Sequence, residues 1–123
     1  MANRLEADVT GLLAFFIERI NLKKLTNEEL EYLASATEEA AGEATTLSRI
    51  VSGIGCLISN DQVATGMKSG ALQDDSVPEL LWFISNRIEE IGKMAWIGSE
   101  AEYCLRVRAQ DSASTAAAES NHG

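Results

Sequence analysis

Histidine, proline and cysteine are nearly missing from this chain of 123 residues, which has one histidine, one proline and two cysteines. The only histidine, His122, stands next to the last residue, so the segments with helical patterns lack the commonest general base and the commonest metal ligand. A catalytic triad would have no base, and a di-iron bundle would have no Glu-x-x-His pair. We therefore expect a protein that is not an enzyme and that has no catalytic residue, cofactor or metal.

Long apolar runs are also absent. No stretch reaches the ~18 apolar residues of a transmembrane helix. The short apolar run over residues 11–17 follows acidic Glu6 and Asp8, where a signal peptide would carry basic residues. The two cysteines, Cys56 and Cys104, do not have the spacing of a metal site or of a redox motif. These absences predict a cytoplasmic protein.

Basic residues are scarce relative to acidic ones, with 10 against 19 and a net charge of −9. Such a charge repels phosphate backbones and anionic lipid surfaces, so direct binding to nucleic acid or to a membrane is disfavoured. The partners that fit are basic proteins, or partners indifferent to charge. The alternative is that the negative charge only keeps the protein soluble.

What the sequence does have is helical periodicity. Apolar residues recur at steps of three and four over residues 5–21, which predicts an amphipathic helix ending at Asn21 in a left-handed conformation. Thr26 and Glu29 match a capping box that starts a second helix, which we expect to run to about Ser59. Gly53 and Gly55 weaken that helix and are the positions where it could bend. A heptad seam indicates long helix-on-helix packing; it consists of Leu30, Thr37, Ala44, Val51 and Ile58, alternating with Leu33, Ala40, Leu47 and Ile54.

A third helix is predicted to start at Ser76, where Ser76 and Glu79 repeat the capping pattern and Pro78 occupies the tolerated first turn. Gly98-Ser99 leaves two alternatives: the helix ends there and a final one runs through Arg108, or it continues without a break. Residues 60–76 are expected to be a loop, in which Val63 and Met67 could form a short helical turn. Residues 110–123 contain no large apolar residue and are expected to be disordered.

These patterns predict an all-α domain over residues 1–109. It is a bundle of three main helices, the second and third long and antiparallel, with a short fourth helix as an option and a disordered tail over residues 110–123. Antiparallel packing places Cys56 and Cys104 at opposite ends, too far apart for a disulfide. Part of the long second helix stays uncovered, and we expect a homodimer to cover it.

Six glutamates lie between Glu28 and Glu43, and no lysine or arginine occurs between Lys24 and Arg49. They form either a docking surface for a basic partner or a solvated acidic face. Two tryptophans fourteen residues apart share one heptad face, as a second buried face against the first helix or as exposed anchors for a partner. The candidate partner-binding residues are Glu28, Glu31, Glu38, Glu39, Glu43, Trp82 and Trp96.

In size, acidity and helical content the chain resembles small accessory proteins of bacteria and their mobile elements, such as antitoxins, secretion chaperones and phage-encoded inhibitors. The expected function is that of a non-enzymatic helical protein that binds and neutralises or regulates a basic protein, as an antitoxin, an anti-defence inhibitor or a DNA mimic would. One alternative is a helical adaptor or chaperone that holds a partner helix in an apolar groove. The other is a small enzyme subunit.

Overall fold

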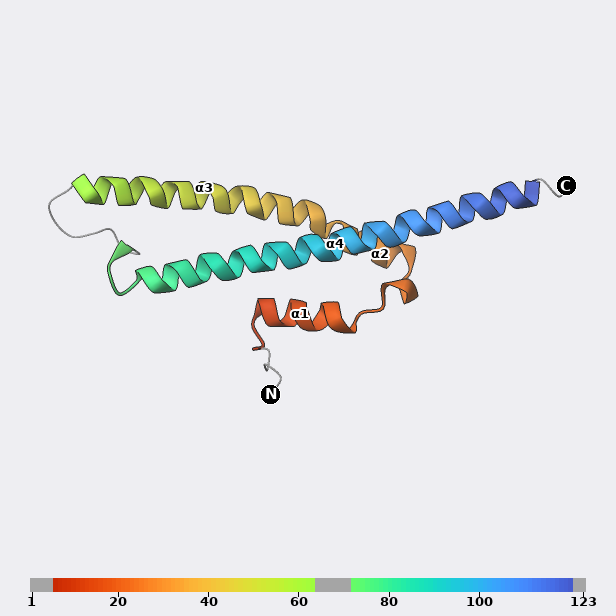
Figure 1. Ribbon diagram of the computed structural model, residues 1–123, viewed down its shortest axis with the longest axis horizontal. Helices are drawn as coiled ribbons and strands as arrows, with labels where there is room; N and C mark the ends of the chain where they lie inside the picture. The colour runs from red at the N-terminus through yellow and green to blue at the C-terminus, as the bar shows by residue number, and fades with distance from the viewer. Residues whose placement is uncertain (1–5, 64–71, 121–123) are drawn as a thin grey trace.

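The computed structural model describes residues 6–63 and 72–120, and every regular element in these residues is a helix. The chain order is α1 (Val9–Arg19), the 3-10 helix η1 (Leu22–Lys24), α2 (Asn27–Ala34), α3 (Ala36–Val63) and α4 (Val77–Ser120). The two long helices, α3 and α4, lie side by side and run in opposite directions (Figure 1). The predicted all-α fold with an antiparallel long pair is thus confirmed.

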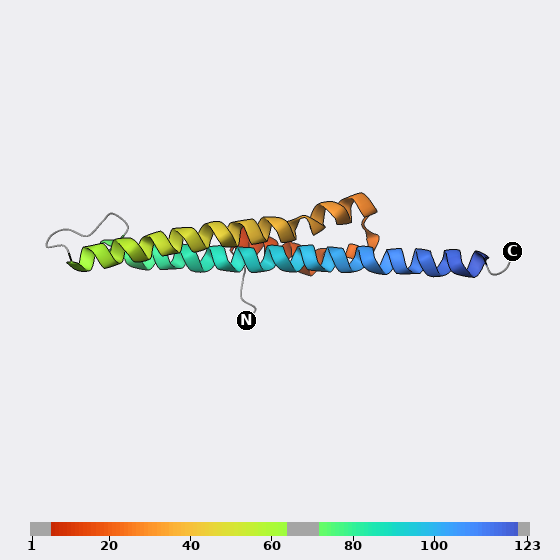
Figure 2. The same cartoon turned by 90° about the horizontal axis from the view of Figure 1, so that it is seen from above.

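Three of the helices form a single layer. In Figure 1, α4 occupies the middle, with α3 along one side and α1 along the other. Turned by 90°, the same helices largely overlap, and α2 stands out of the layer (Figure 2). Helix α3 therefore packs mainly on α4, and the two faces of the α3–α4 pair remain open along much of its length.

Hydrogen bonds from side chains near each helix start determine where α1, η1 and α2 begin. Asp8 caps α1, because its Oδ1 accepts a 2.8 Å hydrogen bond from the Gly11 N–H, so the helix begins at Val9 and not at residue 5 as expected. Asn21 lies beyond the end of α1 in an extended conformation, not a left-handed one, and its Oδ1 accepts from the Lys23 N–H to start η1. The capping box before α2 is confirmed: the Glu29 N–H donates to Thr26 Oγ1 at 3.1 Å, and the Thr26 N–H donates to Glu29 Oε1 at 3.0 Å.

The second helix is not continuous, because Ser35 divides it into α2 and α3. The Ser35 hydroxyl donates to the Tyr32 carbonyl, and the Ser35 N–H is shared between the carbonyls of Glu31 and Tyr32. A serine hydroxyl bonded to a carbonyl of the preceding turn competes with the helical pattern and bends helices. The glycines Gly53 and Gly55 do not break the helix, since α3 runs without interruption to Val63.

Helix α4 continues through Gly98, so the second of the two alternatives for this position is the observed one. Gly98 is buried against the junction of α2 and α3. A Cβ atom there would lie 2.6 Å from the Thr37 nitrogen and 3.2 Å from the Ala34 carbonyl oxygen. The missing side chain thus lets α4 cross this junction at backbone distance.

The expectation of a disordered tail is wrong for residues 110–120, which extend α4 with exposed side chains. Alanine, glutamine and glutamate have high helix propensity, and lengthening an existing helix avoids the cost of nucleation. Burial is therefore not needed for this segment to be helical. The expected loop over residues 60–76 begins later than predicted, because α3 includes residues 60–63. Met67, which was an optional short helical turn together with Val63, lies outside the described residues, as do residues 121–123.

The core is small and lies mostly where α4 crosses α2 and the start of α3. The buried apolar residues among those described are Leu30, Ala40, Leu47, Leu72, Ile97 and Ala101. From the predicted seam, Val51 and Ile58 remain 43% and 44% exposed, so the row that begins at the buried Leu30 is open along the second half of α3. Cys56 and Cys104 are both free thiols, as the antiparallel geometry predicted.

Candidate partner-binding groove

A groove of about 640 Å³ runs between α3 and α4 and combines carboxylates with apolar side chains. We call it the acidic groove; its lining residues are Glu38, Glu39, Gly42, Glu43, Thr46, Leu47, Ile50, Phe83 and Arg87. It brings together three of the five predicted glutamates. The helix period explains this, because Glu39, Glu43 and Thr46 lie three or four residues apart and share one side of α3.

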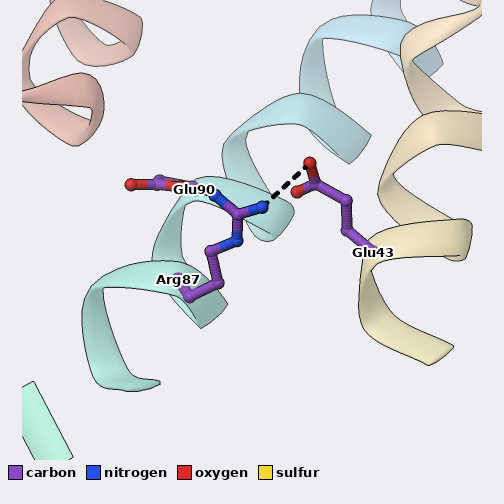
Figure 3. A network of polar contacts seen from close by, with 3 residues as sticks. All are labelled: Glu43, Arg87 and Glu90. Atoms are coloured by element: carbon purple, nitrogen blue, oxygen red, sulfur yellow. Dashed lines mark hydrogen bonds and ion pairs between the residues drawn. The ribbon is translucent and has the colours of Figure 1, made fainter. Parts of the chain in front are cut away.

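Charge is unevenly balanced in the acidic groove. Arg87 reaches from α4 to Glu43 on α3 at 3.3 Å, and it also pairs with Glu90 at 3.2 Å (Figure 3). Glu38 and Glu39 are exposed and form no ion pair within the described part of the chain. Since the charge of Arg87 is already shared between two carboxylates, the end of the groove near the α2–α3 junction keeps uncompensated negative charge.

The other end of the acidic groove is apolar. Ile50 on α3 is 52% exposed and Phe83 on α4 is 64% exposed. Neither residue was among the predicted partner-binding residues, because each lies just off the apolar seam of its helix. One pattern in the sequence pointed to them. Ile50 directly precedes Val51, and Phe83 directly precedes Ile84, and both of these neighbours line an apolar groove on the other side of the α3–α4 contact.

The remaining predicted glutamates lie elsewhere. Glu28 borders a separate hollow of about 330 Å³ between α1 and α2, together with Glu29 and Tyr32. Glu31 is exposed on α2 and lines neither this hollow nor the acidic groove. Because α2 departs from the line of α3 at Ser35, the expected single acidic surface is divided in two.

The two tryptophans do not join the acidic groove either. Trp96 is 46% exposed and borders a shallow pocket against Ile17 of α1. Trp82 is 65% exposed, so of the two alternatives for this residue, a buried face or an exposed side chain, the exposed one is observed. Neither side chain lines the acidic groove.

An apolar groove of about 480 Å³ lies on the opposite side of the α3–α4 contact. The buried Leu47 separates the two sides: Ile50 falls in the acidic groove, while the next residue, Val51, falls in the apolar one. The helices place Phe83 and Ile84 on different sides in the same way. We call this the apolar groove; it is lined by Val51, Ile54, Gly55, Ile58, Asp61, Leu72, Val77, Leu80, Leu81 and Ile84, and a shallower pocket extends it past Ala44, Ser48, Ile88 and Ile91.

The described residues offer no arrangement for metal binding, because no three His, Cys, Asp or Glu side chains among them converge on one point. None of the described helices has an apolar stretch long enough to cross a membrane. The hydrogen bond from the Thr26 backbone N–H, followed by the one from the Thr26 side chain, lowers the pKa of Glu29. This carboxylate caps α2 and lies outside the acidic groove.

Comparison of the chain with protein-family models, with curated proteins and with solved structures finds no significant match.

Proposed function

We propose that this chain is an interaction protein whose acidic groove binds a basic, amphipathic helix of a protein partner, and that binding neutralises or regulates that partner. The observation that carries the proposal is the pairing of uncompensated carboxylates, Glu38 and Glu39, with two exposed apolar side chains, Ile50 and Phe83, in one groove. A helix laid in a groove is a recurring mode of peptide recognition, in which apolar anchors enter the groove.

The spacing of the groove defines the partner's pattern. Glu39 and Ile50 are eleven residues apart on α3, which corresponds to about 16 Å or three helical turns. A partner helix that lies along α3 would then carry lysine or arginine about three turns from an apolar anchor. The basic residue would pair with Glu38 and Glu39, and the anchor would lie between Ile50 and Phe83.

Both parts of the groove contribute in different ways. Exposed ion pairs add only ~0.2–1 kcal/mol each and are screened by salt, so the carboxylates mainly select a basic partner and speed its approach. Burial of an aromatic side chain contributes ~1.5–3 kcal/mol and is insensitive to salt. We expect the affinity to depend on Phe83 and the selectivity to depend on Glu38 and Glu39.

The test compares two charge reversals of equal size. Glu38→Lys with Glu39→Lys alters the acidic groove, while Glu28→Lys with Glu31→Lys makes the same change of charge on α2. Proteins captured from the source organism by the unaltered chain are identified, purified and titrated against each variant at low and high salt. We expect the groove variant to weaken binding at least ~10-fold, equivalent to ~1.4 kcal/mol, and the α2 variant to change it much less.

A matched apolar pair completes the experiment. Phe83→Ala should weaken binding at both salt concentrations, whereas Trp82→Ala, a neighbouring exposed aromatic outside the groove, should not. If the two charge reversals had equal effects, only overall charge would matter. A partner that binds both charge variants and Phe83→Ala as tightly as the unaltered chain would refute the proposed site.

A further inference from the structure

We propose that the apolar groove is the interface of a homodimer, and that its occupant is the same groove of a second copy of this chain. The inference concerns the face opposite the acidic groove and does not depend on the proposed function. Three observations support it: the thin core beside the groove, the distribution of charge, and the area left exposed.

The half of the α3–α4 pair that contains the apolar groove has little core of its own. Of the described residues around the groove, only Leu47 and Leu72 are buried, while Leu81 and Ile88 are 59% and 57% exposed. Two helices side by side bury only one stripe of each other, and helical hairpins normally complete their core against further helices. A cover must therefore be present whenever the chain is folded, and a second copy is always available where the chain itself is present.

The distribution of charge favours the apolar groove over the acidic groove as the contact between two copies. Each copy carries a net charge of −9, so contact through the acidic groove would bring like charges together. The apolar groove and its extension contain one charged residue, Asp61, which stands near the end of α3. The central part of this face is uncharged and can be buried against itself, as a two-fold interface requires.

The exposed area reaches the minimum that a specific interface needs. The face presents four large aliphatic side chains that are 43–59% exposed, Val51, Ile58, Leu81 and Ile88, as well as the partly covered Ile54 and Ile84. Pairing two such faces would bury on the order of 1,000–1,200 Å² in total, which reaches the lower range of specific protein interfaces. The product would be a four-helix bundle built from two antiparallel hairpins.

The experiment measures molar mass by sedimentation equilibrium or light scattering for the full chain and for two double variants. Leu81→Lys with Ile88→Lys places charges on the proposed interface. Ile50→Lys with Phe83→Lys places them on the opposite side of the same helices, at positions that are 52% and 64% exposed and hence equally tolerant in a single chain. We expect the unaltered chain and the second variant to have twice the 13.3 kDa mass of one copy at micromolar concentration, and the first variant to dissociate at least ~100-fold more readily.

Loss of structure in the first variant is also informative. If Leu81→Lys with Ile88→Lys unfolds while the equally exposed control pair stays folded and dimeric, the interface positions are buried in solution, as the dimer requires. The melting temperature of the unaltered chain should also rise with its concentration, because association stabilises the folded state. An unaltered chain that is monomeric at all concentrations, or a first variant that remains dimeric, would overturn the proposal.

Discussion

At Gly98 the absence of a side chain determines how closely α4 crosses the α2–α3 junction. Beside it the Thr37 hydroxyl is buried and has no hydrogen-bond partner among the described residues. Gly92 lies less than two turns earlier in the same helix, and a Cβ atom there would meet nothing within 4 Å. The two glycines thus occupy opposite environments in one helix.

Replacing these glycines by alanine should have opposite effects. Alanine is favoured over glycine in a helix by ~1 kcal/mol, so Gly92→Ala should stabilise the protein by about that amount. In Gly98→Ala the same gain is outweighed by ~3 kcal/mol of overpacking against a backbone atom, which leaves a net loss of about 2 kcal/mol. Urea unfolding of both variants measures the difference. Equal shifts in the same direction would show that α4 does not approach the junction closely.

Through Glu29, the stability of the start of α2 depends on pH. Its pKa is lowered below the ordinary value of 4.5 by hydrogen bonds from Thr26. A lowered carboxyl pKa gives stability that is present above pH 4.5 and is lost as the pH falls through the lower value of the folded state. In Glu29→Gln, which keeps the capping pattern without the charge, this part of the pH dependence should disappear. Melting temperatures of both proteins between pH 3 and pH 7 test this, and parallel curves would contradict it.

At the scale of the elements, the Arg108 side chain of α4 binds the link between α1 and α2, which consists of residues 20–26. The Arg108 guanidinium donates to the Leu25 carbonyl at 2.7 Å, to the Lys23 carbonyl at 3.1 Å and to Asn27 Oδ1 at 2.8 Å. Lys23 lies in η1, Leu25 follows η1 as its C-cap, and Asn27 is the first residue of α2. The planar guanidinium reaches the three acceptors with two separate nitrogens, whereas the donors of a lysine all lie on one nitrogen.

Arg108→Lys should therefore loosen this link and destabilise the protein by about 1 kcal/mol, because at least one buried or partly buried carbonyl loses its donor. Hydrogen exchange should increase in α1 and η1 while α3 keeps its protection. The neighbouring Arg106→Lys is the control, since Arg106 is exposed. Equal exchange in all three proteins would mean that Arg108 does not hold the link.

The positions of the helices in the sequence were largely predictable, but the way in which the helices bend and pack against one another was not. The Thr26–Glu29 capping box and the apolar periods are local patterns, so they identify helices and one of their starts from the sequence alone. The bend at Ser35 depends on which carbonyl a hydroxyl chooses, and the close crossing at Gly98 depends on what lies opposite. For the same reason Glu38, Glu39 and Glu43 could be predicted as site residues. That they lie apart from Glu31 and share a groove with Phe83 could not be predicted, because both facts depend on how the helices pack.

At the scale of the whole molecule, the last three turns of α4 stand apart from the bundle. All side chains of residues 109–120 are exposed, so the segment adds helix without adding core. Deleting residues 110–123 should reduce the circular dichroism signal by the contribution of about three helical turns and shift the melting temperature by less than ~2 °C. A larger drop in melting temperature would show that this segment contacts the rest of the protein.

The length of α4 also affects how the protein moves in solution. Its 44 residues span about 66 Å, whereas a compact chain of this size has a radius of gyration of only about 14 Å. An elongated particle experiences more friction than a sphere of equal mass, and it tumbles more slowly about its short axes than about its long one. A single copy should therefore leave a gel-filtration column early, at the volume of a larger globular protein. Elution volume alone would mistake one extended chain for two compact ones.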